Sequence, residues 1–285
     1  MIAAKSHIEW IDGAKGVAII SVILLHSLPC LYEIGSIFHI GQAVPVFLFI
    51  TAYLTSTRFN GINTYFTRER IWKLIKNVLI PFLAVLCIQL VCLAIDNRLP
   101  SFKTILKSGG VGPGSYYVWL YMLTWVIVPF VVLMVRRVPM SVSMSIMLLI
   151  AIGAEYIFVF LQRVEHIEAL YRLLPIRYLM VIYLGCLWPL VESRQKYILF
   201  ALAYVSGLLM FVDSYVINNV LHANTLKRGG VNIVPSYWNG YHWYTAFYVI
   251  LPIMFLEKLK YTDALKQAGK YSWYIFLLQM MCFGF

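Results

Sequence analysis

Long stretches without a charged residue follow one another along most of the chain, separated by short segments that hold its Lys and Arg residues. Each stretch is uniformly apolar rather than alternating, which is typical of membrane-spanning helices and not of the strands of a membrane barrel. The pattern predicts nine helices, at 16–32, 38–57, 77–96, 116–135, 140–161, 174–191, 197–216, 240–256 and 271–285. We therefore expect an all-α polytopic membrane protein, with about nine or ten transmembrane helices in one bundle and one domain over residues 1–285.

The composition excludes a soluble enzyme and a disordered chain. Of the 285 residues, 61% are hydrophobic and only 12% are charged, and the mean hydropathy is +0.79, whereas soluble domains carry about 25% charged residues. A net charge of +11 would suggest nucleic acid in a soluble protein. Here the basic residues flank apolar runs, where they set membrane topology. The expected partner is thus a lipid bilayer and not nucleic acid.

The distribution of Lys and Arg predicts the orientation of the chain. A cytoplasmic N-terminus assigns about two thirds of the 23 Lys and Arg residues to the inner side, as the positive-inside rule requires. The first 15 residues mix both charges and do not resemble a cleaved signal peptide. The last apolar run reaches Phe285 without a basic anchor, so we expect a chain cut short within its last helices.

The cysteines do not predict a metal site. They are five in number, mostly lie inside apolar runs and lack the spacing of metal ligands, so they are interpreted as small buried hydrophobic residues. They are Cys30, Cys87, Cys92, Cys186 and Cys282.

His26 is the first candidate for chemistry. It follows Lys15 by eleven residues on the same expected helix, about 16 Å further along at 1.5 Å per residue. An ionisable side chain at membrane depth is costly and usually faces the protein interior. Imidazole can take a proton from a hydroxyl and return it to a leaving thiol. A structural histidine that is hydrogen-bonded to a neighbouring helix is the alternative, and this residue alone favours that alternative.

A basic segment precedes the third expected helix. It contains Arg68, Arg70 and Lys73, of which Arg70 and Lys73 are three residues apart and therefore neighbours on a helix face. Such a face could bind the phosphates of a nucleotide-bearing donor such as a coenzyme A thioester. A cluster of charges that only stops transfer into the membrane is the alternative.

Further polar residues lie near the ends of later apolar runs. Glu155 and Arg177 could pair with each other or hold a polar acceptor, and Asp213, His242 and Gln279 are similar candidates. Each alone is more often a helix-packing group than a catalyst. The glycine-rich segment at 109–114 lacks the ending of a P-loop, and we interpret it as a flexible loop near a substrate entrance.

Taken together and in order, six motifs resemble the membrane-bound acyltransferase-3 family, of the glycan O-acyltransferase type. The resemblance covers nearly all of the chain, although no single motif is specific. The motifs are Lys15 with His26 eleven residues later; Pro45-Val-Phe-Leu-Phe-Ile-Thr-Ala-Tyr53; Arg70-x-x-Lys73 followed by Pro81; Tyr116-Tyr-Val-Trp119 with Pro129; Arg177-Tyr-Leu-x5-Gly185; and Gly269-Lys-Tyr-Ser272 through Gln279. Three positions depart from the family pattern, where Arg, Gly and His are commoner: Lys15, Ala52 and Gln279.

The resemblance implies transfer of an acyl group, usually acetyl, from cytoplasmic acyl-CoA to a hydroxyl of a cell-surface or lipid-linked glycan, in the inner membrane of a bacterium. Acyl-CoA is then a co-substrate, and no bound cofactor is expected. The family's ten helices also imply that one is missing here. The implied site residues are His26 as general base or transient acyl carrier, Lys15 orienting the donor, Arg68, Arg70 and Lys73 on the donor side, and Glu155, Arg177 and Trp119 on the acceptor side.

Two other functions remain open from the sequence. A transporter or flippase of glycan precursors would also need polar groups in the membrane and a basic cytoplasmic face, but it is commonly built on an inverted repeat, which we do not find. A purely structural membrane subunit would leave the ordered motifs unexplained.

Overall fold

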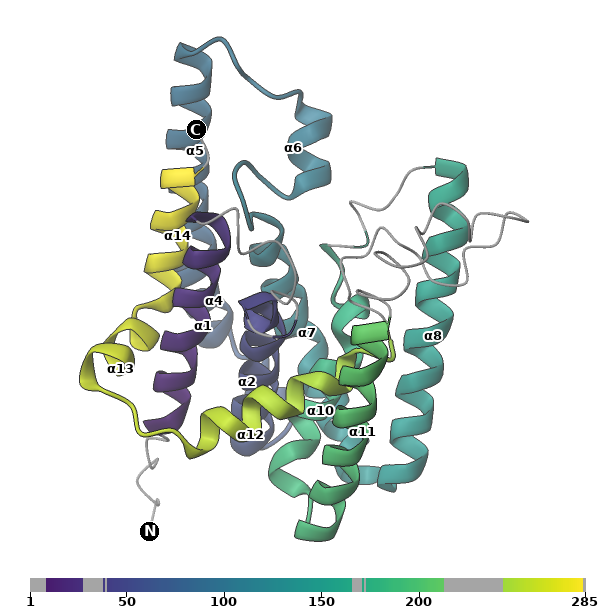
Figure 1. Ribbon diagram of the computed structural model, residues 1–285. Helices are drawn as coiled ribbons and strands as arrows, with labels where there is room; N and C mark the ends of the chain where they lie inside the picture. The colour runs from purple at the N-terminus through teal and green to yellow at the C-terminus, as the bar shows by residue number, and fades with distance from the viewer. Residues whose placement is uncertain are drawn as a thin grey trace.

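The computed structural model describes residues 9–27, 38, 40–165, 171, 173–212 and 243–283. Every element in these residues is a helix, and no strand occurs among them, which confirms the all-α prediction. Most of the helices stand side by side in a bundle (Figure 1). The main helices are α1 (Glu9–Ser27), α2 (Ala43–Arg58), α5 (Ile80–Ile95), α7 (Tyr116–Arg137), α8 (Met140–Glu165), α10 (Leu179–Leu187), α11 (Ser193–Phe211), α12 (Ile250–Lys258) and α14 (Ser272–Phe283).

Shorter helical segments connect or extend the main helices. The short α-helices are α3 (Ile62–Tyr65), α4 (Arg68–Leu74), α6 (Phe102–Ser108) and α13 (Asp263–Lys270). The 3-10 turns are η3 (Ile40–Gln42), η5 (Pro175–Tyr178), η6 (Trp188–Leu190) and η9 (Ala246–Val249), and η4 (Ile75–Leu79) is a π-helical turn. The sequence pattern did not predict α6 or α13, because both lie in polar segments between apolar runs.

Four helices are long and apolar enough to cross a membrane. They are Trp10–Ser27, Arg68–Ile95, Tyr116–Arg137 and Met140–Phe158. Three further apolar helices are shorter, at Ala43–Arg58, Pro175–Leu190 and Ser272–Phe283, so each is shorter than the roughly 20 residues that a straight span needs. The chain is thus a multi-pass membrane protein, and the number of nine or ten spans stays a prediction.

Helix α10 lies in the middle of the core, since all of its residues from Leu179 to Leu187 are buried. It packs against α2, α7 and α8. At Gly185 a side chain would collide with the backbone of Phe49 in α2, so glycine is what allows the two helices to approach so closely. The hydroxyl of Ser56 donates a hydrogen bond to the carbonyl of Cys186 at 2.8 Å and closes the same interface.

The first helix begins earlier than the sequence pattern predicted. Charged residues at positions 9, 12 and 15 ended the apolar run, so the prediction began at Gly16, whereas α1 begins at Glu9. The reason is that Asp12 is buried, with 8% of its surface exposed, because α13 packs against this end of α1. Lys15 therefore lies almost two turns inside a helix rather than at its edge.

The third predicted helix is also longer than expected. Residues Arg68–Ile95 form one continuous helix, and the π-helical turn Ile75–Leu79 lies just before Pro81. Proline lacks the N–H that would continue the α-helical ladder, and a π turn is one way in which a helix accommodates such a break. As a consequence, the basic residues of α4 lie on the first two turns of this helix and not in a loop.

Candidate functional site

Lys15 and His26 both lie on α1, which is one unbroken α-helix. Lys15 is half-buried, and it interacts electrostatically with Asp12 on its own helix and with Arg58 at the end of α2. Asp12 and Lys15 are three residues apart and therefore neighbours on one face. The carboxylate offsets part of the repulsion between the two cations, so that positive charge collects at this end of α1.

Close packing of α13 fixes the position of this part of α1. At Gly16 a side chain would collide with the carbonyl of Leu265, and at Gly269 it would collide with the carbonyl of Asp12. The two backbones are therefore in direct contact, which only glycine permits. Thr262 caps α13 by accepting a hydrogen bond from the N–H of Leu265. The segment that holds Asp12 and Lys15 is thus held by backbone contact.

His26 lies in the last turn of α1 and faces α14. Its ring centroid is 6.5 Å from that of Phe283, the ring is half-buried, and α1 packs along α14 (Figure 1). His26 therefore lies against a neighbouring helix, as a catalytic residue and a structural residue both would. Lys15 lies in the first half of α1 and His26 in its last turn, eleven residues apart on the same helix.

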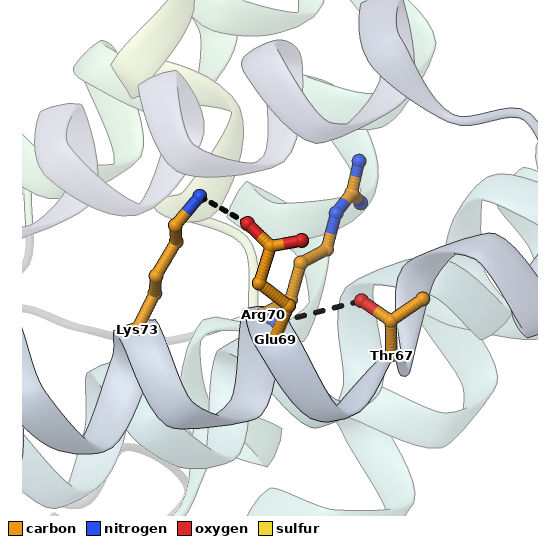
Figure 2. A network of polar contacts seen from close by, with 4 residues as sticks. All are labelled: Thr67, Glu69, Arg70 and Lys73. Carbon is orange, nitrogen blue, oxygen red and sulfur yellow. Dashed lines mark hydrogen bonds and ion pairs between the residues drawn. The ribbon is translucent and has the colours of Figure 1, made fainter.

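The basic segment is the exposed N-terminal part of the long helix that begins with α4. Thr67 caps it by accepting a hydrogen bond from the N–H of Arg70 at 3.4 Å, and Lys73 forms an ion pair with Glu69 at 2.7 Å (Figure 2). Arg68, Arg70 and Lys73 are all exposed. Because the carboxylate of Glu69 compensates the positive charge of Lys73, Arg70 is the stronger candidate for binding an anion.

An aromatic cluster that sequence reasoning missed holds Arg70. The guanidinium lies over the Tyr65 ring, 5.7 Å from its centroid. Tyr65 packs on Trp125 of α7 with ring centroids 4.9 Å apart, and its hydroxyl donates to the Trp125 carbonyl at 3.1 Å. Phe59 at the end of α2 also packs on Tyr65. The sequence signal for this cluster is the aromatic pair Tyr65-Phe66 just before the charged residues.

Arg136 was also missed, and it joins α7 to the end of α2. Its guanidinium donates hydrogen bonds to the carbonyls of Ser56 at 2.7 Å and Phe59 at 2.9 Å, and it lies over the Phe59 ring. The last carbonyls of a helix have no partner within that helix, so Arg136 caps α2 from outside. The cap holds the chain around Arg58, whose charge acts on Lys15.

The predicted acceptor residues Glu155 and Arg177 lie near one another. Glu155 is 6% exposed and accepts a hydrogen bond from the backbone N–H of Trp243 at 2.8 Å. Both Glu155 and Arg177 interact electrostatically with Tyr171, and the Arg177 guanidinium lies over the Tyr178 ring. The structure therefore groups these two residues around one tyrosine.

Trp119 holds the glycine-rich loop. Its indole N–H donates to the carbonyl of Gly109 at 2.6 Å, and Gly109 adopts a left-handed backbone with φ of 76° that favours glycine. The indole N–H of Trp119 is thus hydrogen-bonded to the loop, while 38% of the residue surface is exposed.

Three other polar candidates do not join these groups. Asp213 and His242 lie outside the described residues, and Gln279 is buried in α14.

Comparison with known proteins identifies the family. A family model described as an acyltransferase domain, Acyl_transf_3, matches residues 8–285. No curated protein and no solved structure matches the chain. Together with the apolar helical bundle, the match defines a membrane acyltransferase. The chain belongs to the acyltransferase-3 family, as the order of its motifs indicated.

Proposed function

We propose that this membrane acyltransferase transfers an acyl group, normally acetyl, from cytoplasmic acyl-CoA to a hydroxyl of a cell-surface or lipid-linked glycan. The observation that carries the proposal is that Lys15 interacts with Arg58 in the first half of α1, whereas His26 lies against α14 in the last turn of the same helix. The proposed location is the inner membrane of a bacterium, with the N-terminus in the cytoplasm and no resident cofactor.

The donor would bind at the Lys15 end of α1. A chain of contacts runs there from Arg58 through the neighbouring Phe59 to Tyr65 and Arg70, so the cations of α1, α2 and α4 belong to one region. Coenzyme A carries several phosphate groups, and guanidinium groups bind phosphates through paired hydrogen bonds. Arg70 would bind a phosphate, Arg68 and Lys73 would add to the attracting field, and Lys15 would orient the donor.

His26 would perform the proton transfers. In the direct path, its imidazole takes the proton of the glycan hydroxyl as that oxygen attacks the thioester carbonyl. The new carbon–oxygen bond forms, the carbon–sulfur bond breaks, and the imidazolium returns the proton to the thiolate of coenzyme A. In the alternative path, the imidazole itself attacks the thioester and carries the acyl group briefly. Either path benefits from a site that excludes water, because water would hydrolyse the thioester.

The acceptor would contact the region around Glu155, Arg177 and Trp119. The buried carboxylate of Glu155 and the guanidinium of Arg177 are suited to sugar hydroxyls, one as acceptor and the other as donor of hydrogen bonds. Since the indole N–H of Trp119 is committed to Gly109, its exposed ring would serve as an apolar surface for a sugar.

The test is release of coenzyme A from acetyl-CoA by the purified protein in lipid vesicles. Wild type is expected to release it slowly without an acceptor. Lys15→Met, which keeps the length and removes the charge, should raise the KM for acetyl-CoA about tenfold, the equivalent of one charge-assisted contact. Lys260→Met is the matched control, because Lys260 is exposed between α12 and α13. A folded wild type that never releases coenzyme A contradicts the proposal, and movement of a glycan lipid would then be measured instead.

A further inference from the structure

Helix α14 buries a polar side chain that the bundle does not satisfy. Gln279 is 4% exposed, and neither its amide nitrogen nor its carbonyl oxygen finds a hydrogen-bond partner within the described residues. Buried polar groups are nearly always hydrogen-bonded in folded proteins, and the cost of an orphaned amide is higher where water is excluded. Both ends of one carboxamide are involved, so the side chain is available to a ligand as donor and as acceptor.

The position of Gln279 connects it to His26. Phe283, whose ring lies 6.5 Å from the ring of His26, follows Gln279 by four residues on α14. Residues four apart share a helix face, and the distance along the axis is about 6 Å. Because α1 packs along α14, Gln279 lies about one helical turn from the level of Phe283, on the face of α14 that carries Phe283 toward His26.

A second buried glutamine, Gln89, has a structural role, because its side chain bonds to the backbone of another helix. Gln89 of α5 is 0% exposed, and its amide nitrogen donates to the carbonyl of Met280 at 2.8 Å. This bond joins α5 to α14. Both glutamines are buried, and the carbonyl oxygen of each has no hydrogen-bond partner among the described residues, but only the amide nitrogen of Gln89 bonds to another helix.

We propose that Gln279 is a substrate-binding residue whose amide N–H donates a hydrogen bond to the thioester carbonyl of the acyl donor, beside His26. The inference rests on the proposed function, in which that carbonyl is attacked. As the oxygen attacks, negative charge develops on the carbonyl oxygen, and a fixed donor in a dry site stabilises this charge more than it stabilises the ground state. Gln279 changes no covalent bond, and its carbonyl oxygen would accept a hydrogen bond from an amide N–H of the acyl-CoA molecule, because the single hydrogen of the incoming hydroxyl goes to His26.

The experiment compares Gln279→Met with Gln89→Met in vesicles, since methionine keeps the unbranched length and removes both polar atoms. Release of coenzyme A from acetyl-CoA and the thermal midpoint are measured for each. Gln279→Met is expected to lower kcat about 100-fold, as loss of one such donor does, with an unchanged or higher midpoint. Gln89→Met is expected to lower the midpoint, because it breaks the bond to Met280, and to keep a kcat near that of wild type.

A binding measurement on wild type serves if the variant does not fold. S-acetonyl-CoA keeps a carbonyl and cannot be cleaved, and S-propyl-CoA lacks that oxygen. Wild type should bind the first more tightly by about tenfold, the equivalent of one buried hydrogen bond. Equal binding of the two analogues, a Gln279→Met variant as active as wild type, or one that loses stability as Gln89→Met does, overturns the inference. Wild type that binds neither analogue and releases no coenzyme A overturns the proposed function itself.

Discussion

The guanidinium carbon of Arg70 lies 5.7 Å from the centre of the Tyr65 ring, and this places an exposed cation on a buried support. Tyr65 is 6% exposed and is itself fixed to α7 through Trp125. A cation over an aromatic face is attracted by the electron density of the ring. Arg70 is therefore held in one direction, as the proposed role of binding a phosphate requires.

Tyr65 should consequently act on donor binding through Arg70. Tyr65→Phe keeps the ring and removes only the bond to the Trp125 carbonyl, which costs about 1 kcal/mol of stability. Tyr65→Leu removes the aromatic face and should raise the KM for acetyl-CoA about fivefold, the equivalent of one cation–π contact, without a comparable loss of kcat. Steady-state kinetics of the two variants checks this. If the KM rises equally in both, the ring does not position Arg70.

Glu69 is predicted to oppose donor binding. It pairs with Lys73 at 2.7 Å on the exposed side of α4, so Glu69→Gln leaves Lys73 uncompensated next to Arg70. The KM for acetyl-CoA should fall about twofold, a small factor because exposed ion pairs are weak. The effect should disappear at about 1 M salt, where charges are screened within about 3 Å. A KM that rises at low salt would contradict a phosphate-binding role for this segment.

Gly269 is predicted to be essential for the placement of Lys15. Gly269→Ala puts a methyl group onto the carbonyl of Asp12, and such overpacking costs about 1–3 kcal/mol. Since α13 then has to move away from α1, activity should fall together with the thermal midpoint. Gly153→Ala in α8 is the matched control, because its methyl group meets nothing within 4 Å. That variant should gain about 0.5–1 kcal/mol from the better helix propensity of alanine. Equal midpoints for the two variants would show that α13 does not hold α1.

Arg136 is predicted to stabilise the protein through its geometry rather than its charge. Arg136→Lys keeps the charge but cannot donate to the carbonyls of Ser56 and Phe59 together. We expect a loss of about 1–3 kcal/mol in the free energy of unfolding, measured by thermal unfolding in detergent. The neighbouring Arg137 is exposed as Arg136 is, but its side chain makes none of the hydrogen bonds described, so Arg137→Lys should leave the midpoint where it is. Both substitutions keep the charge, so a loss of equal size in both variants would contradict a specific role for the two hydrogen bonds of Arg136.

The helices could largely be predicted, because uniformly apolar runs have few other structures in a membrane. Their ends could not. Because a charged residue ends an apolar run, the first helix is predicted to start at Gly16. In the structure α1 begins at Glu9, and Asp12 is buried where α13 packs on α1. That burial depends on a backbone contact between Gly16 and Leu265, some 250 residues apart along the chain, which no local pattern contains.

The residue types of the candidate site could be predicted from the sequence, but the contacts that hold those residues in place could not. The spacing of Lys15 and His26 along one helix follows directly from sequence, as does the shared face of Arg70 and Lys73. The partners of these residues do not: Arg136 reaches the carbonyl of Ser56 across 80 residues, and the carboxylate of Glu155 accepts from the backbone of Trp243 across 88. Tertiary contacts of this kind involve backbone groups, which every residue has and no motif marks.

The measurement that tests the account most directly is release of coenzyme A by His26→Ala beside Ser27→Ala. The two residues are adjacent in the last turn of α1, and the hydroxyl of Ser27 bonds only its own helix, at the carbonyl of Ile23, among the contacts described. With equal amounts of folded protein in vesicles, we predict that Ser27→Ala releases coenzyme A as wild type does, and that His26→Ala is slower by about 100-fold or more, the contribution of a general base. Equal rates for the two variants would contradict a catalytic His26 and leave it as a residue that packs α1 against α14.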